Sequence, residues 1–205
     1  MIELFVSAFV TFFVVIDPPG CAPIFAGLTQ GATAAHRRAM AMRAVGVAAA
    51  ILLVFALAGE DLLRGLGIEL ASFRIAGGIM LFLIALEMVF EKRTQRREDR
   101  AAKVTQDEAE DVSIFPMAMP MIAGPGSIAT VMLLMSHTDG VARTAVVLGA
   151  LGANLLLTLI ALMAAGSLMK LMGAKIEAVI TRLLGVLLAA LAVQFVIDGV
   201  QSQFG

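Results

Sequence analysis

Hydrophobic residues along the chain fall into six blocks that are separated by shorter polar stretches. Each block approaches the roughly 20 residues that an α-helix needs to cross about 30 Å of hydrocarbon. The pattern therefore predicts an all-α polytopic membrane protein with six transmembrane helices. The predicted segments are 2–16 with a continuation beyond an interruption, 40–59, 73–90, 113–135, 142–168 and 179–200.

Composition supports insertion into a lipid bilayer rather than a soluble fold. Of the 205 residues, 60% are hydrophobic and 15% are charged, against about 45–50% and about 25% in soluble domains. The formal net charge of −1 says little about nucleic-acid or anionic partners, because the charges cluster in loops. No nucleic-acid partner is expected. The acidic start at Glu3 differs from the positive start of a cleavable signal peptide, so we expect the first segment to be retained.

Positive charges are distributed unequally between alternate loops. Twelve of the 15 Lys and Arg residues fall on one side of the predicted membrane, and only Arg64, Arg74 and Arg143 fall on the other. Basic loops stay in the cytoplasm, so the count predicts that both termini lie outside. A charged linker, 91–112, separates a first three-helix unit, 1–90, from a second one, 113–205.

The two units resemble each other in sequence. Pro19-Gly20 aligns with Pro125-Gly126 at an offset of 106, and "IELASFRIAG" aligns with "IEAVITRLLG" at an offset of 108. Three spans are an odd number, so the second copy would enter the membrane from the opposite face. Inverted repeats are typical of secondary transporters, whose substrate sites lie near the midplane at the repeat interface. A duplicated membrane scaffold with no transport role is the alternative.

Helix-breaking residues interrupt the first segment of the first unit. Residues 2–16 would form a helix of about 22 Å at 1.5 Å per residue, which is too short to cross the membrane comfortably. Pro18, Pro19 and Gly20 are then expected to break the hydrogen-bond ladder. Pro23 suits the first turn of a new helix.

The second unit repeats this arrangement. "SIFPMAMPMI" forms a short half, Gly124-Pro125-Gly126 forms the break, and Ser127 can cap the next helix. Irregular backbone survives at membrane depth only where protein buries it or where it lines a wet cavity. Each unit would therefore start a new helix near the midplane, with unpaired N–H groups and a positive dipole end. The pattern fits through-going broken helices and re-entrant hairpins equally.

The two breaks together suggest a site for a small zwitterion. Half-helix N-termini would bind a carboxylate, and the intramembrane carboxylate of Asp17 would bind an ammonium group, a cation or a proton. Asn154 and Thr158 lie one turn apart on the fifth segment and are added to the site. The candidate substrate-binding residues are Asp17, Pro18, Gly20, Cys21, Pro23, Gly124, Pro125, Gly126, Ser127, Asn154 and Thr158.

Structural alternatives exist for each of these residues. Asp17 could only cap the second half-helix, and the Pro-Gly breaks could serve packing alone. Asn154 and Thr158 could bond between helices instead of lining a site. The sequence leaves these alternatives open.

Four stretches resemble the MarC family of bacterial inner-membrane proteins: "DPPGCAPIFAGLT", "MPMIAGPGSIATVM", "FRIAGGIMLFLIALEMV" and "LLGVLLAALAVQFVIDG". The resemblance covers nearly the whole chain and both breaks. It implies a plasma-membrane protein related to the lysine exporter superfamily, with SnatA-like members described as small neutral amino acid transporters. Cys21 departs from the family pattern, in which this position is more often Asn.

These observations lead to one expected function and one alternative. We expect a secondary transporter or exporter of small neutral amino acids, such as glycine or alanine. The alternative is a passive channel or an accessory scaffold. An enzyme is not expected, because the sequence offers no clustered catalytic groups at membrane depth. No cofactor is expected; coupling to H⁺ or Na⁺ and assembly into a homo-oligomer are left open.

Overall fold

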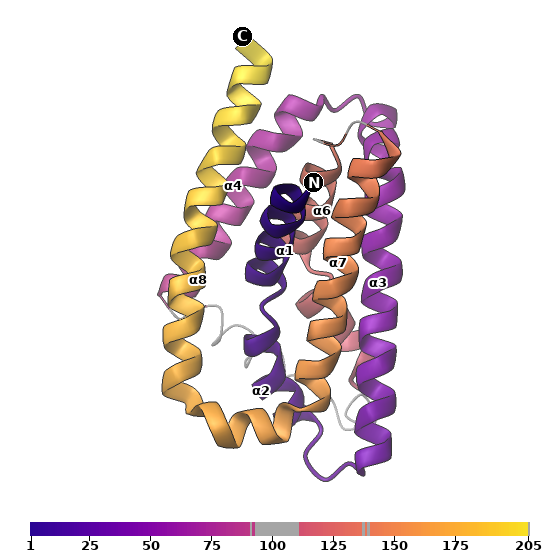
Figure 1. Ribbon diagram of the computed structural model, residues 1–205, viewed down its shortest axis with the longest axis vertical. Helices are drawn as coiled ribbons and strands as arrows, with labels where there is room; N and C mark the ends of the chain where they lie inside the picture. The colour runs from indigo at the N-terminus through magenta and orange to yellow at the C-terminus, as the bar shows by residue number, and fades with distance from the viewer. Residues whose placement is uncertain (91, 93–110, 137, 139, 205) are drawn as a thin grey trace.

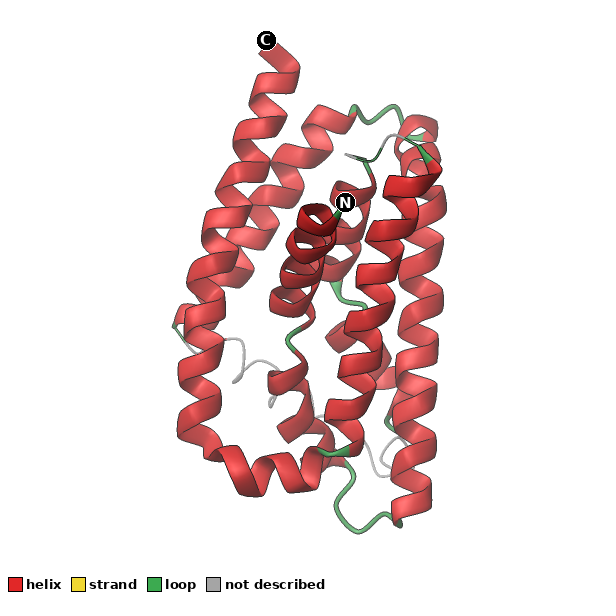
Figure 2. Cartoon of the chain, in the orientation of Figure 1, coloured by secondary structure: helices red, strands yellow, loops and turns green. Residues whose placement is uncertain are grey.

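The computed structural model describes residues 1–90, 92, 111–136, 138 and 140–204, and this part of the chain consists of helices joined by loops, with no strand (Figure 2). The helices form one elongated bundle (Figure 1). In chain order they are α1 (Ile2–Ile16), α2 (Pro18–Leu28), α3 (Ala34–Gly65), α4 (Leu70–Val89), η2 (Ser113–Ile122), α6 (Pro125–Met135), α7 (Val141–Met163) and α8 (Ala165–Phe204).

The bundle supplies up to six membrane spans, as the hydrophobic pattern predicts. Five spans are long and apolar enough by themselves, and the first of them is Ile2–Leu28, which contains both α1 and α2. The sixth consists of η2 and α6, which bend by 51° at their junction. In Figure 1 α1 and α2 follow one another along the bundle, so the first break lies within a single candidate span.

Several helices extend beyond the apolar blocks. α3 begins at Ala34 and ends at Gly65, several residues outside 40–59 at each end. α8 is 40 residues long, and its first part crosses one end of the bundle before the helix turns along it (Figure 1). Polar helix ends project past the hydrocarbon at little cost, because hydropathy marks the membrane core rather than the helix limits.

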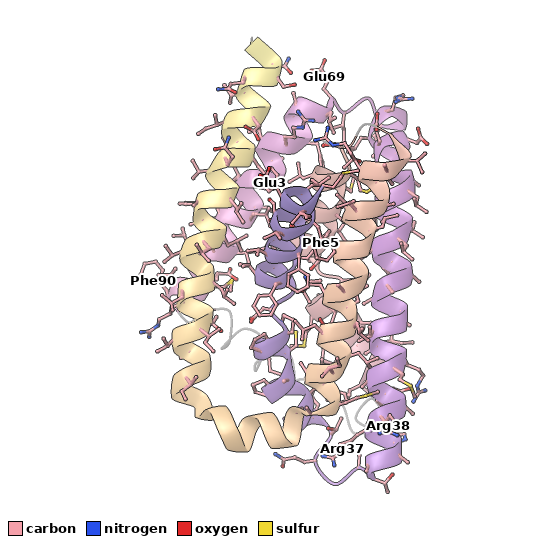
Figure 3. All side chains as sticks on the ribbon, viewed as in Figure 1. Glu3, Phe5, Arg37, Arg38, Glu69 and Phe90 are labelled. Carbon is pink, nitrogen blue, oxygen red and sulfur yellow. The ribbon has the colours of Figure 1, made fainter. Side chains whose placement is uncertain are left out.

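The two ends of the bundle differ in charge. The basic end is where α2 and α7 finish and where α3 and α8 begin, and it carries Arg37 and Arg38 (Figure 3). At the opposite end α3 leads into α4, α6 leads into α7, and Glu69 is exposed (Figure 3). Both termini point toward this opposite end (Figure 1).

α4 and α8 pack closely along one side of the bundle. A Cβ on Gly78 would lie only 2.8 Å from the Ala192 carbonyl oxygen, and one on Gly185 would lie 3.1 Å from the Ala85 carbonyl oxygen. Small residues allow membrane helices to approach at backbone distance. The α4–α8 pair therefore forms a continuous wall beside the broken segments.

Candidate functional site

The first break is one residue wide. Asp17 adopts the left-handed conformation (φ 58°, ψ 65°) and is both the C-cap of α1 and the N-cap of α2. Its amide still donates to the Phe13 carbonyl at 2.9 Å, and its carbonyl accepts from the Cys21 amide at 3.0 Å. Asp is one of the few residues that tolerate this conformation. The chain thus changes direction at one residue, and the helical ladder is interrupted only over Pro18, Pro19 and Gly20, whose amide bonds to the Asp17 side chain.

The carboxylate of Asp17 is buried in the centre of the bundle. Its side chain is 1% exposed, and Oδ1 accepts a hydrogen bond from the Gly20 amide at 3.1 Å. This is the N-cap interaction that the sequence left as an alternative. Capping and substrate binding are compatible, because a carboxylate has several acceptor positions.

The prolines mark the first break as expected, and only Pro23 differs from the prediction. Pro18, Pro19 and Gly20 form the first turn of α2, where the two prolines have no N–H to continue the ladder of α1. Pro23 lies inside α2, one turn later than the first turn in which we expected it. Cys21 is buried, and its thiol donates to the Ile16 carbonyl at 3.5 Å.

The second break lacks a side-chain cap. Ala123 and Gly124 have non-helical backbone angles, α6 begins at Pro125, and its N-cap is Gly124. Ser127 is the third residue of α6, so the prediction that it caps the helix is wrong. Among the described residues, no acceptor is bonded to the amides of Gly126 and Ser127.

Close approach of the backbone explains why glycine occupies position 124. A Cβ there would overlap the Pro120 carbonyl oxygen at the end of η2. η2 is itself irregular, with extended backbone at Phe115 and Met119. A capping side chain such as aspartate cannot fit at this position, so the first amides of α6 stay open.

The structure changes the sequence alignment of the two breaks by one residue. Asp17 and Gly124 are the N-caps, and Pro18 and Pro125 are the first residues of the new helices. These pairs are 107 positions apart. The alignment at an offset of 106 placed Ala123 opposite Asp17 and is wrong here, because the cap position and not the Pro-Gly pair is what the two breaks share.

The two breaks meet near the middle of the bundle. Figure 2 shows both as short non-helical connections at about half its height. A Cβ on Gly126 would lie 3.4 Å from Cγ1 of Val15 and 2.7 Å from Cδ1 of Ile84 on α4. The open end of α6 therefore packs against the last turn of α1, close to Asp17.

Asn154 and Thr158 are buried on α7 but make structural hydrogen bonds. Asn154 Nδ2 donates to the Phe9 carbonyl at 2.7 Å, and Thr158 Oγ1 donates to the Asn154 carbonyl at 2.8 Å. Phe9 precedes Asp17 by about 12 Å of helix. Asn154 thus ties α1 to α7 above the break, while its Oδ1 is buried without a partner.

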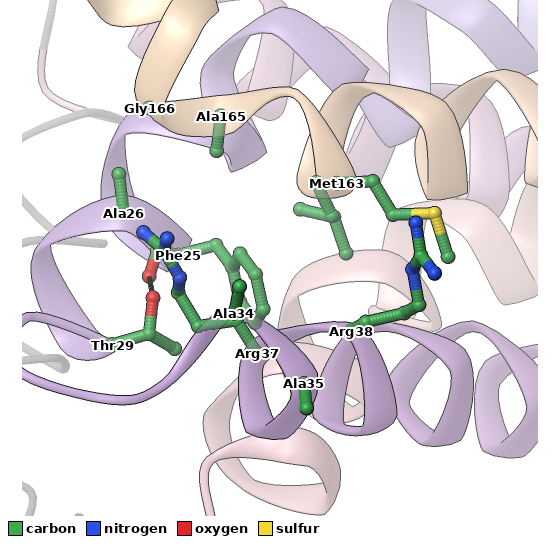
Figure 4. A pocket seen from close by; sticks show the side chains of 11 residues that line it. Phe25, Ala26, Thr29, Ala34, Ala35, Arg37, Arg38, Met163, Ala165 and Gly166 are labelled. Atoms are coloured by element: carbon green, nitrogen blue, oxygen red, sulfur yellow. Dashed lines mark hydrogen bonds between the residues drawn. The ribbon is translucent and has the colours of Figure 1, made fainter.

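Cavities lie away from the breaks at both ends of the bundle, among them one of about 330 Å³ lined by Glu60, Arg64 and Glu69, and sequence reasoning did not find them. One, of about 700 Å³, opens at the basic end (Figure 4), and one of about 200 Å³ lies at the opposite end. Arg37 and Arg38 line the larger cavity (Figure 4), although the sequence used them only to orient the chain. In the described part of the chain, His, Cys, Asp and Glu side chains form no group of three that could hold a metal.

Comparison with known proteins identifies the family. Residues 2–204 match the family model described as MarC family integral membrane protein. A UPF0056 membrane protein of Methanocaldococcus jannaschii is 36% identical over 204 residues, covering 98% of each chain. The UPF0056 membrane protein YvbG of Bacillus subtilis is 34% identical and covers 100% of this chain and 97% of its own. No solved structure matches the chain. The chain therefore belongs to the MarC family of integral membrane proteins.

Proposed function

We propose that this protein is a secondary transporter of small neutral amino acids such as glycine and alanine, and not an enzyme. The observation that carries the proposal is the meeting of two unlike helix breaks inside a membrane bundle. One break contributes the buried carboxylate of Asp17, and the other contributes the open amides of Gly126 and Ser127. A zwitterion needs one negative and one positive binding partner, and this pair supplies both.

The packing of the helices supports an inverted repeat. α2 packs against α7 and α8, and α6 packs against α3 and α4. The close contacts of α4 and α8 are reciprocal: Gly78 approaches Ala192, while Gly185 approaches Ala85. Both pairs of equivalent positions are 107 apart, so Gly185 corresponds to Gly78 rather than to Gly77. Such reciprocity is the property of a two-fold axis.

The two breaks offer opposite charges, and this difference supports recognition of a zwitterion. A buried carboxylate in a membrane is expensive and is retained where it serves a function. Asp17 would bind the ammonium group, and the amides of α6 would bind the carboxylate. The residues at the second break, Gly124, Gly126 and Ser127, are small, which favours a small solute over a large one.

The charge distribution supports an orientation in the plasma membrane. Arg37 and Arg38 belong to the basic end, which would face the cytoplasm. Both termini would then face outward. The relatives come from archaea as well as bacteria, so this orientation would apply to a cytoplasmic membrane in either.

Uptake into liposomes tests the proposal. Reconstituted protein should accumulate labelled alanine or glycine, first under a proton gradient and then under a Na⁺ gradient, which identifies the coupling ion. Asp17→Asn should reduce uptake at least about tenfold, since loss of one charge-assisted contact removes about 1.5–3 kcal/mol. Asparagine keeps the cap and tolerates the left-handed backbone, so the bundle should still fold.

Asp61→Asn is the matched control. Asp61 lies at the end of α3 with its side chain 80% exposed, so its replacement should leave uptake unchanged. The proposal is contradicted if no amino acid in a panel is taken up or exchanged, or if Asp17→Asn transports as well as the wild type.

A further inference from the structure

Two of the cavities, of about 700 Å³ and about 200 Å³, lie at opposite ends of the bundle but are built by corresponding elements. The larger one is lined by the end of α2, the start of α3, the end of α7 and the start of α8. The smaller one is lined by the end of α6, the start of α7, the end of α3 and the start of α4. If α2, α3 and α4 are exchanged with α6, α7 and α8, respectively, the set of elements that lines one cavity becomes the set that lines the other.

Individual lining residues correspond as well. Five positions in the larger cavity each have a counterpart in the smaller cavity, and every pair is separated by the 107 residues that also separate Asp17 from Gly124. This agreement makes the two cavities equivalent parts of the repeated unit. The paired positions are Phe25 and Met132, Thr29 and Ser136, Arg37 and Thr144, Phe55 and Leu162, and Ala56 and Met163.

At the smaller cavity a side chain closes the passage between helices. Met132 of α6 lies against Gly59 of α3, and its Cγ and Cε are 2.8 Å and 2.9 Å from where a Cβ on Gly59 would be. Gly59 is buried. The absence of a side chain at position 59 is therefore what lets Met132 seat against the α3 backbone.

At the larger cavity the equivalent contact is absent. The counterparts of Met132 and Gly59 are Phe25 and Gly166, which both line the cavity. Of the atoms in the described residues, only Nη1 of Arg37, at 4.0 Å, comes within 4 Å of a Cβ on Gly166. Phe25 therefore has no atom within 4 Å of that position, so the described residues contain no counterpart here of the contact between Met132 and Gly59.

The open cavity also has the chemistry to receive a carboxylate. Arg37 and Arg38 line it, and neither guanidinium has an ion pair or hydrogen-bond partner in the described part of the chain. The rest of its lining is mostly apolar, including Phe25 and Leu162. Unpaired guanidinium groups beside an apolar wall attract small carboxylate-bearing solutes.

We propose that the cavity lined by Arg37 and Arg38 is the open entrance of a pathway for small carboxylate-bearing amino acids, and that the cavity closed by Met132 on Gly59 is its counterpart at the other end. This inference rests on the proposed transport function. In the opposite state Phe25 closes on Gly166, and Met132 leaves Gly59. The two entrances are then open alternately, and the helix breaks lie between them.

Paired cysteines test the alternation in the full chain. Cys21 is the single cysteine, so Cys21→Ala provides the background. One variant carries Gly59→Cys with Met132→Cys, and the other carries Phe25→Cys with Gly166→Cys. Replacing Met132 removes the atoms that crowd position 59, and position 166 has open space, so both variants should fold. Purified protein is oxidised with copper phenanthroline, with and without saturating alanine, and the linked peptides are measured.

We expect the 59/132 pair to form a disulfide readily without alanine, and the 25/166 pair to form little. Alanine should raise the yield of the 25/166 disulfide and lower that of the 59/132 disulfide. Intact uptake together with yields that do not change in opposite directions overturns the paired entrances while leaving transport standing. Reciprocal change without uptake of any amino acid supports the entrances and overturns the proposed function.

Charge at the entrance is tested separately. Arg37→Gln with Arg38→Gln should raise the KM for alanine from the basic side about three- to tenfold with little change in kcat. Arg143→Gln, at an exposed position near the start of α7, is the matched control and should change neither. An unchanged KM in the double variant overturns the carboxylate role of the two arginines.

Discussion

The two helix breaks occupy equivalent places but solve the same structural problem in opposite ways. At the first, Asp17 turns the chain and caps α2 with its own carboxylate. At the second, Gly124 occupies the cap position, has no side chain, and leaves the amides of Gly126 and Ser127 open. The residue at the cap position thus decides whether a helix start within the bundle carries a charge or offers donors.

The first half of each broken span is also held by a polar tie to a neighbouring helix. Asn154 of α7 donates to the Phe9 carbonyl of α1. Asp111, just before η2, forms a 2.6 Å ion pair with Arg43 of α3. The first tie is buried in the bundle and the second is partly exposed, so we expect the first to contribute more to stability.

The largest effect is expected from adding a methyl group at the second break. Gly124→Ala places a Cβ against the Pro120 carbonyl oxygen, and neither backbone segment can move freely. We expect the free energy of unfolding to fall by about 3 kcal/mol or more, measured as a loss of melting temperature in detergent. Gly149→Ala on α7 is the control, because nothing lies within 4 Å of a Cβ there. Equal melting of the two variants would show that the close approach at Gly124 is absent.

Two substitutions of Asp17 should separate its role as a helix cap from the role of its charge. Asp17→Ala removes the cap and puts a residue with a Cβ and no local acceptor in the left-handed conformation, which together cost about 2 kcal/mol. Asp17→Asn should retain most of that stability while losing transport. If both variants melt alike, capping is not what position 17 contributes to the fold.

The tie at α7 should have an intermediate effect. Asn154→Ala removes the hydrogen bond to the Phe9 carbonyl, and interhelical hydrogen bonds in membranes contribute about 0.6–1.7 kcal/mol. Thr158→Val removes a bond that stays within α7 and should change the melting temperature less. A larger loss for Thr158→Val would reverse this ranking.

The ion pair between Asp111 and Arg43 of α3 should have the smallest effect on stability, and this effect should depend on pH. Burial raises the pKa of the Asp111 carboxyl, but hydrogen bonds from Ser113 and the charges of Arg43 and His36 outweigh it and hold that pKa below its usual range. A lowered pKa stabilises the fold above the unfolded value of about 3.9, and this contribution is lost as pH falls through the native value. Because the pair is partly exposed, it is worth less than about 1 kcal/mol.

Melting of Asp111→Asn and wild type at pH 7 and pH 3 checks this tie. The variant should melt slightly lower at pH 7, and the difference should shrink at pH 3. An equal difference in melting temperature at both pH values would show that the charge of Asp111 does not contribute to stability.

The sequence predicted the membrane class, the six spans and the location of both breaks, because these depend on apolar length and on proline and glycine. It could not predict which residue caps each new helix. Pro18 and Pro125 are compatible with several registers, and only the contact between Gly124 and the Pro120 carbonyl selects the observed one.

The cavities could not be predicted from the sequence, because their lining residues come from helices that are far apart along the chain. Arg37 and Arg38 look like ordinary basic loop residues until α2, α7 and α8 are placed around them. Met132 and Gly59 likewise belong to different units and are 73 positions apart, so their contact follows only from the packing of α6 on α3.

Binding of alanine and of its two single-charge analogues to purified protein tests the central claim most directly. Propionate lacks the ammonium group that Asp17 would bind, and ethylamine lacks the carboxylate that the α6 amides would bind. The account predicts that alanine raises the melting temperature of the wild type while neither analogue does so at the same concentration, and that Asp17→Asn loses the shift with alanine. An equal shift with propionate or ethylamine, or an undiminished shift in Asp17→Asn, would contradict a site formed by the two breaks.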